Sequence, residues 1–159
     1  MNLEPKKRIS AEALKVWKIS GAILVTVGWS LAATAIFIIH IFDWPVWISA
    51  ALIIFGIFEL LLLVFILPSL KWKRWRYEVR EEEIELQRGI FIQTRTLIPM
   101  IRVQHVDTVQ GPLLRRYRLA SVIINTAATA HEIPALEESE AEELRTFISN
   151  LARVADEDV

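Results

Sequence analysis

The sequence predicts an α+β membrane protein: a hairpin of two transmembrane helices, followed by a cytosolic antiparallel β-domain that a C-terminal helix closes. Three observations carry this prediction. Two long runs, residues 20–39 and 44–67, are almost free of charge. From residue 72 onward, apolar and polar residues alternate with the period of a β-strand. The last twenty or so residues return to the helical period.

The two uncharged runs predict the membrane hairpin. Residues 20–39 contain no charged side chain, and residues 44–67 contain one, Glu59. A helix rises about 1.5 Å per residue, so a run of about 20 residues crosses the roughly 30 Å hydrocarbon core of a bilayer. In a soluble protein, both helices would need a large partner surface to cover them. We therefore expect a hairpin over residues 19–70, with helices at about 19–41 and 45–67.

Cleavage as a signal peptide is not expected for the first run, because it is long and has no Ala-x-Ala site before Asp43. Residues 1–18 then form a cytosolic N-terminal segment.

Lys and Arg precede the first run and follow the second, whereas the connecting loop carries neither. The positive-inside rule therefore predicts that both termini are cytoplasmic. We call the basic cluster after the second run the collar and expect it to face anionic lipid. Its members are Lys71, Lys73, Arg74 and Arg76.

The cytosolic domain is expected over residues 72–155. Alternating or β-branched stretches predict five to seven strands, at about 75–79, 81–88, 90–99, 101–109, 121–127 and 131–136. The phase slips near His105, as at a β-bulge. Residues 111–120 form a connector or a short helix. A capping box of Ser139 and Glu142 predicts the start of the last helix, and apolar residues then follow at helical spacing: Leu144, Phe147, Ile148, Leu151, and Val154 or Ala155.

The residues give no sign of an active site. The chain has no cysteine, which excludes disulfides and thiolate chemistry, and its three histidines are scattered. No glycine-rich nucleotide-binding loop is present. His105 and Asp107, two apart on one strand, are expected to form a surface pair rather than a base with its orienting carboxylate. We therefore expect no enzymatic activity, no cofactor and no metal.

A family resemblance lies in residues 102–127, RVQHVDTVQGPLLRRYRLASVIINTA. The Arg-x-Gln-x-Val strand, the Gln-Gly-Pro turn, the Arg-Arg-Tyr connector and the Asn-Thr-Ala strand end resemble bacterial pleckstrin-homology (PH) membrane proteins, most closely the YdbS-like family. The hairpin and the final helix match as well. The likeness implies a PH-like sandwich or barrel in a bacterial cytoplasmic membrane. Many relatives have Gly after the aromatic connector, where this chain has Arg118 and Leu119.

The resemblance also implies a non-enzymatic subunit of a two-component membrane complex. The expected partner is a larger membrane protein of the same family with several PH-like domains, or further copies of this chain. Envelope maintenance or defence is the setting considered. The alternatives are an inner-leaflet sensor of anionic lipid and an accessory subunit of a channel or transporter.

The surface expected to contact the partner or anionic phospholipid is basic and polar. Guanidinium groups form bidentate contacts with phosphate, whereas the near-zero net charge and the membrane tether argue against nucleic acid. A solvated charged edge is the structural alternative. The residues are Arg102, Gln104, Arg115, Arg116 and Arg118.

Glu59 is the intramembrane candidate. Three interpretations stay open: a protonated carboxyl bonded to Thr26 or Ser30 of the first helix, a bond or ion pair with another protein's helix, and proton transfer. Thr26 and Ser30 lie at the same expected depth as Glu59, which makes them suitable hydrogen-bond partners.

Overall fold

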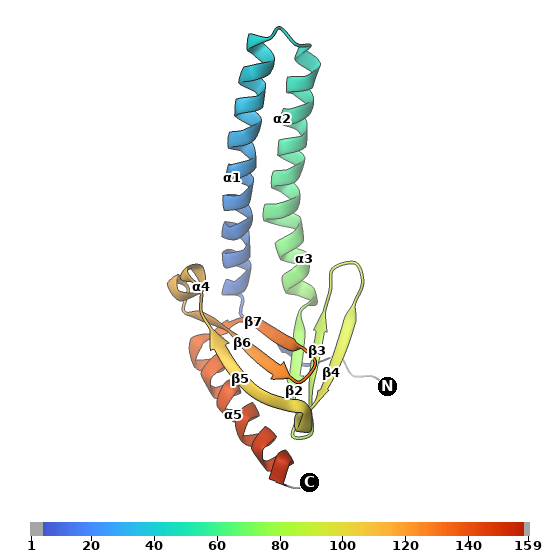
Figure 1. Cartoon of the computed structure of the whole chain (residues 1–159), viewed down its shortest axis with the longest axis vertical. Helices are drawn as coiled ribbons and strands as arrows, with labels where there is room; N and C mark the ends of the chain where they lie inside the picture. Colours follow the sequence, from blue (N-terminus) through green and yellow to red (C-terminus); the bar gives the residue numbers. More distant parts are fainter. Residues whose placement is uncertain (1–4, 158–159) are drawn as a thin grey trace. The chain divides into compact units, whose positions relative to one another are not determined.

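The computed structural model describes residues 5–157 (Figure 1). These residues form two compact units. Trp17–Leu70 is the first, which we call the hairpin unit. The second, the sheet unit, combines the described residues up to Val16 with those from Lys71 onward. Residues on both sides of the hairpin thus belong to one folded body.

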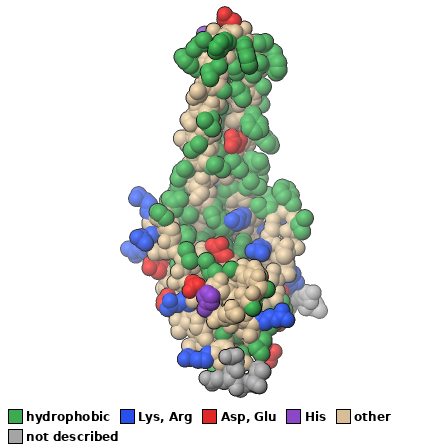
Figure 2. Space-filling model, in the orientation of Figure 1, with side chains coloured by type: hydrophobic (Ala, Val, Ile, Leu, Met, Phe, Trp, Pro, Cys, Tyr) green, Lys and Arg blue, Asp and Glu red, His purple; other side chains and the backbone are tan. Residues whose placement is uncertain are grey.

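The hairpin unit consists of two long helical stretches. The first is α1 (Glu12–Ile41), whose N-terminal turn belongs to the sheet unit, and the second runs without a break through α2 (Val46–Leu60), the π-helix η1 (Leu61–Ile66) and α3 (Leu67–Arg74). Both stretches are long and apolar enough to cross a membrane. Hydrophobic side chains cover the hairpin along its length (Figure 2). The helices extend beyond the expected 19–41 and 45–67, because the polar residues flanking the apolar runs continue the helical backbone.

The sheet unit contains two antiparallel sheets. The first has the order β1-β2-β3-β4 and the second has the order β5-β6-β7. Their bounds are β1 (Lys7–Arg8), β2 (Arg76–Val79), β3 (Glu83–Arg88), β4 (Thr94–Pro99), β5 (Val103–Val109), β6 (Leu119–Thr126) and β7 (Ala130–Glu137). The 3-10 turn η2 (Met100–Arg102) precedes β5, α4 (Pro112–Arg116) precedes β6, and α5 (Glu138–Glu157) ends the described chain. This is the predicted α+β, PH-like fold.

The inner faces of the two sheets form the core with α5, which packs on β5, β6 and η2. Fully buried side chains from both sheets and the helix meet there: Tyr77, Ile84, Leu86, Met100, Leu119, Val122, Ile124, Ile133, Leu136 and Ile148. The buried stripe of α5 runs through Ala141, Leu144 and Ile148, whereas Phe147 and Val154 are exposed. The helical period was predicted correctly, but the stripe is rotated toward Ala141.

The N-terminal segment completes the first sheet, which the sequence pattern did not predict. Lys7 and Arg8 form the edge strand β1, which pairs with Tyr77 and Arg76 of β2. Trp72 donates its indole N–H to the Ser10 carbonyl at 3.0 Å. Four apolar residues of the segment are buried: Pro5, Ile9, Ala13 and Val16. A segment expected to be a separate cytosolic stretch therefore contributes to the core of the sheet unit.

Three local differences have clear physical causes. Residues 90–93, expected to begin a strand, form a loop, because Gly89 turns the chain with a φ of 120°. The capping box of Ser139 and Glu142 does not form among the described residues, since α5 starts at Glu138 and Ser139 already lies within the helix. The Glu138 amide bonds to the Arg118 carbonyl at 3.0 Å. Arg118 has a φ of 52°, a left-handed conformation that favours glycine.

The burial of Ala13 yields a stability prediction. Ala13 has 0% exposure, whereas Ala11, two residues earlier, is exposed. Ala13→Asp should lower the free energy of unfolding of the sheet unit by about 3 to 5 kcal/mol, because it places an unpaired charge in the core. Ala11→Asp is the matched control and should leave stability nearly unchanged. Thermal unfolding of the full chain in detergent measures both; equal stability would mean that the segment is not part of the core.

Candidate functional site

The candidate site in the hairpin unit centres on Glu59. This residue lies on α2, directly before the π-helix η1, and its side chain is half-buried. It faces Gly28 of α1: a Cβ atom at position 28 would lie 3.3 Å from Glu59 Oε2. Single π-helical turns occur frequently at functional positions of helices. The carboxylate therefore lies next to the π-helical turn of its own helix and against a glycine of α1 that has no side chain.

Glycines set the spacing of the two helices. A Cβ atom at Gly21 would lie 2.5 Å from the Leu63 carbonyl oxygen in η1, so any side chain there would push the helices apart. A Cβ at Gly56 would lie 3.0 Å from the Trp29 indole. Small residues allow this kind of close backbone approach between membrane helices, where packing rather than hydrophobic burial drives association.

A groove opens beside the carboxylate. It has a volume of about 340 Å³, and its lining is apolar apart from Glu59. Glycine and alanine on the helix faces leave this space, and larger side chains form its rim. The lining residues are Gly28, Trp29, Leu31, Ala32, Ala35, Leu52, Phe55, Gly56 and Glu59. The groove offers room for a side chain that is not part of the described chain.

The two hydroxyl groups expected to bond Glu59 donate elsewhere. Thr26 Oγ1 donates to the Ala22 carbonyl at 2.8 Å, and Ser30 Oγ donates to the Val27 carbonyl at 2.7 Å. Both bonds lie within α1, where Ser and Thr commonly satisfy themselves on a preceding carbonyl. Within residues 5–157 no hydrogen bond joins Glu59 to either hydroxyl. The internal bond of Glu59 is not formed in this structure and stays a prediction.

The basic residues of the expected partner or lipid surface occupy two parts of the sheet unit. Arg102 ends η2 and Gln104 lies on β5, while Arg115 and Arg116 lie on α4 and Arg118 follows it. All five are exposed. The left-handed turn at Arg118 separates the arginines of α4 from the buried Leu119 of β6. The arginines are thus held on a short, well-defined connector and are not needed to fill the core.

The collar divides into exposed and structural members. Lys71 and Lys73 are exposed on α3. Arg74 donates a hydrogen bond to the Ile90 carbonyl in the loop between β3 and β4. Arg76 lies on β2, opposite Arg8 of β1 and Gln87 of β3. Two members therefore belong to the architecture of the sheet unit, which the charge pattern alone did not reveal.

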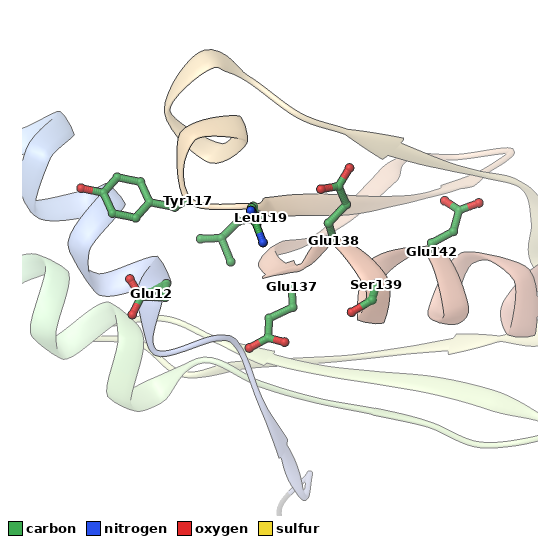
Figure 3. Close-up of a pocket in the computed structure, with 8 residues that line it drawn as sticks. Glu12, Tyr117, Leu119, Glu137, Glu138, Ser139 and Glu142 are labelled. Carbon is green, nitrogen blue, oxygen red and sulfur yellow. The ribbon is translucent and has the colours of Figure 1, made fainter.

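A second cavity, of about 710 Å³, lies in the sheet unit (Figure 3). Its lining comes from the start of α1, the end of α4, β6, β7 and α5, and consists of Glu12, Tyr117, Arg118, Leu119, Glu137, Glu138, Ser139 and Glu142. The four carboxylates make it acidic. They do not converge, and no group of acidic residues or histidines in the described part of the chain is arranged to hold a metal ion. Sequence reasoning missed this cavity because Glu12 and Tyr117 lie far along the chain from Glu137, Glu138 and Glu142.

Two further polar contacts bear on chemistry. His105 Nε2 lies 3.5 Å from Asp107 Oδ2, which also accepts a hydrogen bond from Asn125 at 3.1 Å, and both side chains of the pair are more than half exposed. This is the geometry of a surface pair.

Tyr77 donates its hydroxyl to Glu140 at 2.8 Å. Burial, together with this bond, raises the pKa of Tyr77 above its usual value, so the phenol stays protonated and ties β2 to α5.

Comparison with known proteins identifies the family. The model of the family described as "Bacterial PH domain" matches residues 19–152. The chain is also 50% identical over 159 residues to the UPF0699 transmembrane protein YdbS of Bacillus subtilis (strain 168), covering 100% of both chains. The chain belongs to the bacterial PH domain family.

A second bacterial relative is more distant. The UPF0699 transmembrane protein YdbT of Bacillus subtilis (strain 168) is 26% identical over 83 residues, which are 50% of this chain and 17% of YdbT. No solved structure matches the chain at a significant level. The bacterial PH family match extends from the hairpin into α5 and therefore includes the Glu59 groove as well as the sheets.

Proposed function

We propose that this membrane protein is a non-enzymatic subunit that assembles with a second membrane protein through the groove beside Glu59. The occupant is a transmembrane helix that presents a hydrogen-bond donor to the carboxyl group. One observation carries the proposal: Glu59 is half-buried against Gly28 and has no hydrogen-bond partner among residues 5–157. Assembly leaves the PH-like domain free to contribute a cytosolic contact surface.

The energetics favour an occupant in the membrane. A charged side chain near the bilayer centre costs about 2.5 to 3.5 kcal/mol on insertion scales, and each neighbouring Leu, Ile or Phe offsets about 0.3 to 0.6 kcal/mol. The span therefore inserts, but the carboxyl still lacks a partner. Intramembrane ionisable residues normally face a bundle interior or a polar cavity. A helix seated in the groove would provide both the partner and the burial.

Family relationships support a partner of the same kind. YdbT, the distant relative, carries a region similar to half of this chain within a much longer protein. A larger relative with further PH-like domains would supply both additional helices and additional cytosolic surface. We therefore favour such a protein over self-association. Envelope maintenance or defence is the cellular setting in which we place the complex.

Substitutions at Glu59 test the proposed bond. Gln has nearly the same shape and both donates and accepts hydrogen bonds, but it does not ionise. Glu59→Gln should preserve capture of the partner if the carboxyl is protonated. Glu59→Leu should weaken helix association by about 0.6 to 2 kcal/mol, a roughly three- to thirtyfold change in affinity. Co-purification from gently solubilised membranes measures both; loss with Gln as well would indicate an ion pair.

Two further variants control for nonspecific changes in the membrane. Phe58→Leu changes an exposed neighbour on α2 and should leave assembly intact. Gly28→Val fills the groove while keeping the carboxyl and should reduce capture, whereas Ala33→Val, on an exposed face of α1, should not. Normal assembly by Glu59→Leu and Gly28→Val would refute the groove as an interface.

We also place both termini in the cytoplasm, since lysine and arginine flank the hairpin on one side and the connecting loop has only Asp43. A reporter fused at residue 43 should be active in its external form, and one fused at the C-terminus in its cytoplasmic form. An external C-terminus would contradict the proposed orientation and the role of the collar.

Exposure of Arg115, Arg116 and Arg118 favours a second candidate function, contact with anionic lipid headgroups at the inner leaflet. Such contact is electrostatic and salt-sensitive. A third candidate, an accessory subunit of a channel or transporter, rests on Glu59 alone, and two helices do not form a conduit.

A further inference from the structure

The loop between β3 and β4 is the most apolar exposed feature of the sheet unit. Among all large hydrophobic side chains within residues 5–157, Phe91 and Ile92 have the highest exposed fractions, 87% and 82%. The side chains of the membrane hairpin do not exceed them; Val46 comes next at 81%. Exposed apolar groups of this size, side by side, normally mark a contact surface.

The backbone holds this loop in one shape. Gly89 has a φ of 120°, and a Cβ atom there would lie 1.8 Å from the Ile92 carbonyl oxygen. Only glycine fits such a turn. Arg74 donates a hydrogen bond to the Ile90 carbonyl from the other side. Phe91 and Ile92 are therefore presented at the tip of a fixed loop.

Strand register shows where the loop points. Arg76, at the start of β2, pairs with Gln87 of β3. Because β2 and β3 are antiparallel, the end of β3 extends past the start of β2. It therefore points toward the last turn of α3, which directly precedes β2 in the chain. The bond from Arg74 to Ile90 agrees with this direction, and Figure 1 shows the loop beside that turn. The opposite turn of the same strands, at Glu81, points the other way.

The last turn of α3 lies close to the bilayer surface. Arg74 is seven residues past Leu67, where the apolar run ends, which is about 10 Å along a helix. The headgroup layer of each leaflet is roughly 5 to 8 Å thick. A loop bonded to Arg74 is thus within reach of the headgroups. Exposed Lys73 and Arg88 flank it and match an anionic leaflet.

We propose that the loop Gly89–Gln93 inserts Phe91 and Ile92 into the headgroup–acyl boundary of the leaflet from which α3 emerges. The contact fixes the orientation of the PH-like domain on the bilayer, in addition to the two transmembrane helices. It involves apolar insertion, with Lys73 and Arg88 as electrostatic support. It does not depend on the Glu59 groove.

The absence of cysteine makes a direct test simple, because one introduced cysteine takes one label. Phe91→Cys and Glu81→Cys variants of the full chain are labelled with an NBD fluorophore and reconstituted in phosphatidylcholine vesicles with and without phosphatidylglycerol. Both sites are exposed, and Glu81 lies at the opposite end of the same strands. Doxyl-labelled lipid should quench the label at position 91 several-fold more than the label at position 81.

Each other outcome overturns the proposal. Weak quenching at both positions would mean that the loop stays in water, and protection of position 91 only after adding a partner protein would assign the loop to a protein interface. Equal quenching at both positions would mean that the contact is not specific to the loop. Quenching that vanishes in pure phosphatidylcholine would reduce the contact to electrostatics. The triple Ser variant at Arg115, Arg116 and Arg118 should leave quenching at position 91 unchanged.

Discussion

The structure depends on one shared hydrophobic core that takes residues from both sides of the membrane hairpin. Ile9, Ala13 and Val16 are buried with side chains that follow the second helix. Strand β1 extends the first sheet by pairing with β2. Because of this arrangement, the chain leaves the sheet unit, forms the two apolar helices of the hairpin and returns to the same folded body. The hairpin is an insertion in the domain, because the residues up to Val16 and those from Lys71 onward belong to one unit.

The shared core also bears on how the two helices of the hairpin stay together. Both ends of the hairpin continue into the sheet unit, so the chain connectivity itself keeps the two helices together. The close approaches at Gly21 and Gly56 reflect the pairing, and the groove at Gly28 is the place where it is incomplete. The sheet unit takes up both ends of the hairpin, and the groove is lined by the Glu59 carboxyl group.

Sequence patterns predicted the large elements and missed the contacts that join distant residues. The uncharged runs predicted the two helices, and the period of two predicted β2, β3, β5, β6 and β7, because both signals are local. Strand β1 was not predicted, because two basic residues show no strand pattern. They form a strand only by pairing with β2, on the other side of the hairpin in the sequence. Residues 90–93 resembled a strand by composition, but the positive φ of Gly89 made them a loop.

The candidate site residues were also predictable individually, but not their contacts. Glu59 was recognisable as the sole charge in its run. The arginines expected to contact a partner or lipid are exposed, and that role stays a prediction. The expected bond to Thr26 or Ser30 is not formed among the described residues, where both hydroxyl groups donate to preceding carbonyls of their own helix. Sequence spacing gives the depth of a residue in the membrane, but not its direction around the helix. The small residues opposite Glu59 became meaningful only when the two helices were paired.

The shared core is the central claim, and amide hydrogen exchange of the full chain in lipid nanodiscs tests it most directly. Peptides covering residues 5–16 and 76–88 are compared by mass spectrometry. Both peptides should exchange slowly and open together, since they belong to one cooperative unit. Rapid exchange of residues 5–16 at the rate of unstructured chain, while β2 and β3 stay protected, would contradict it.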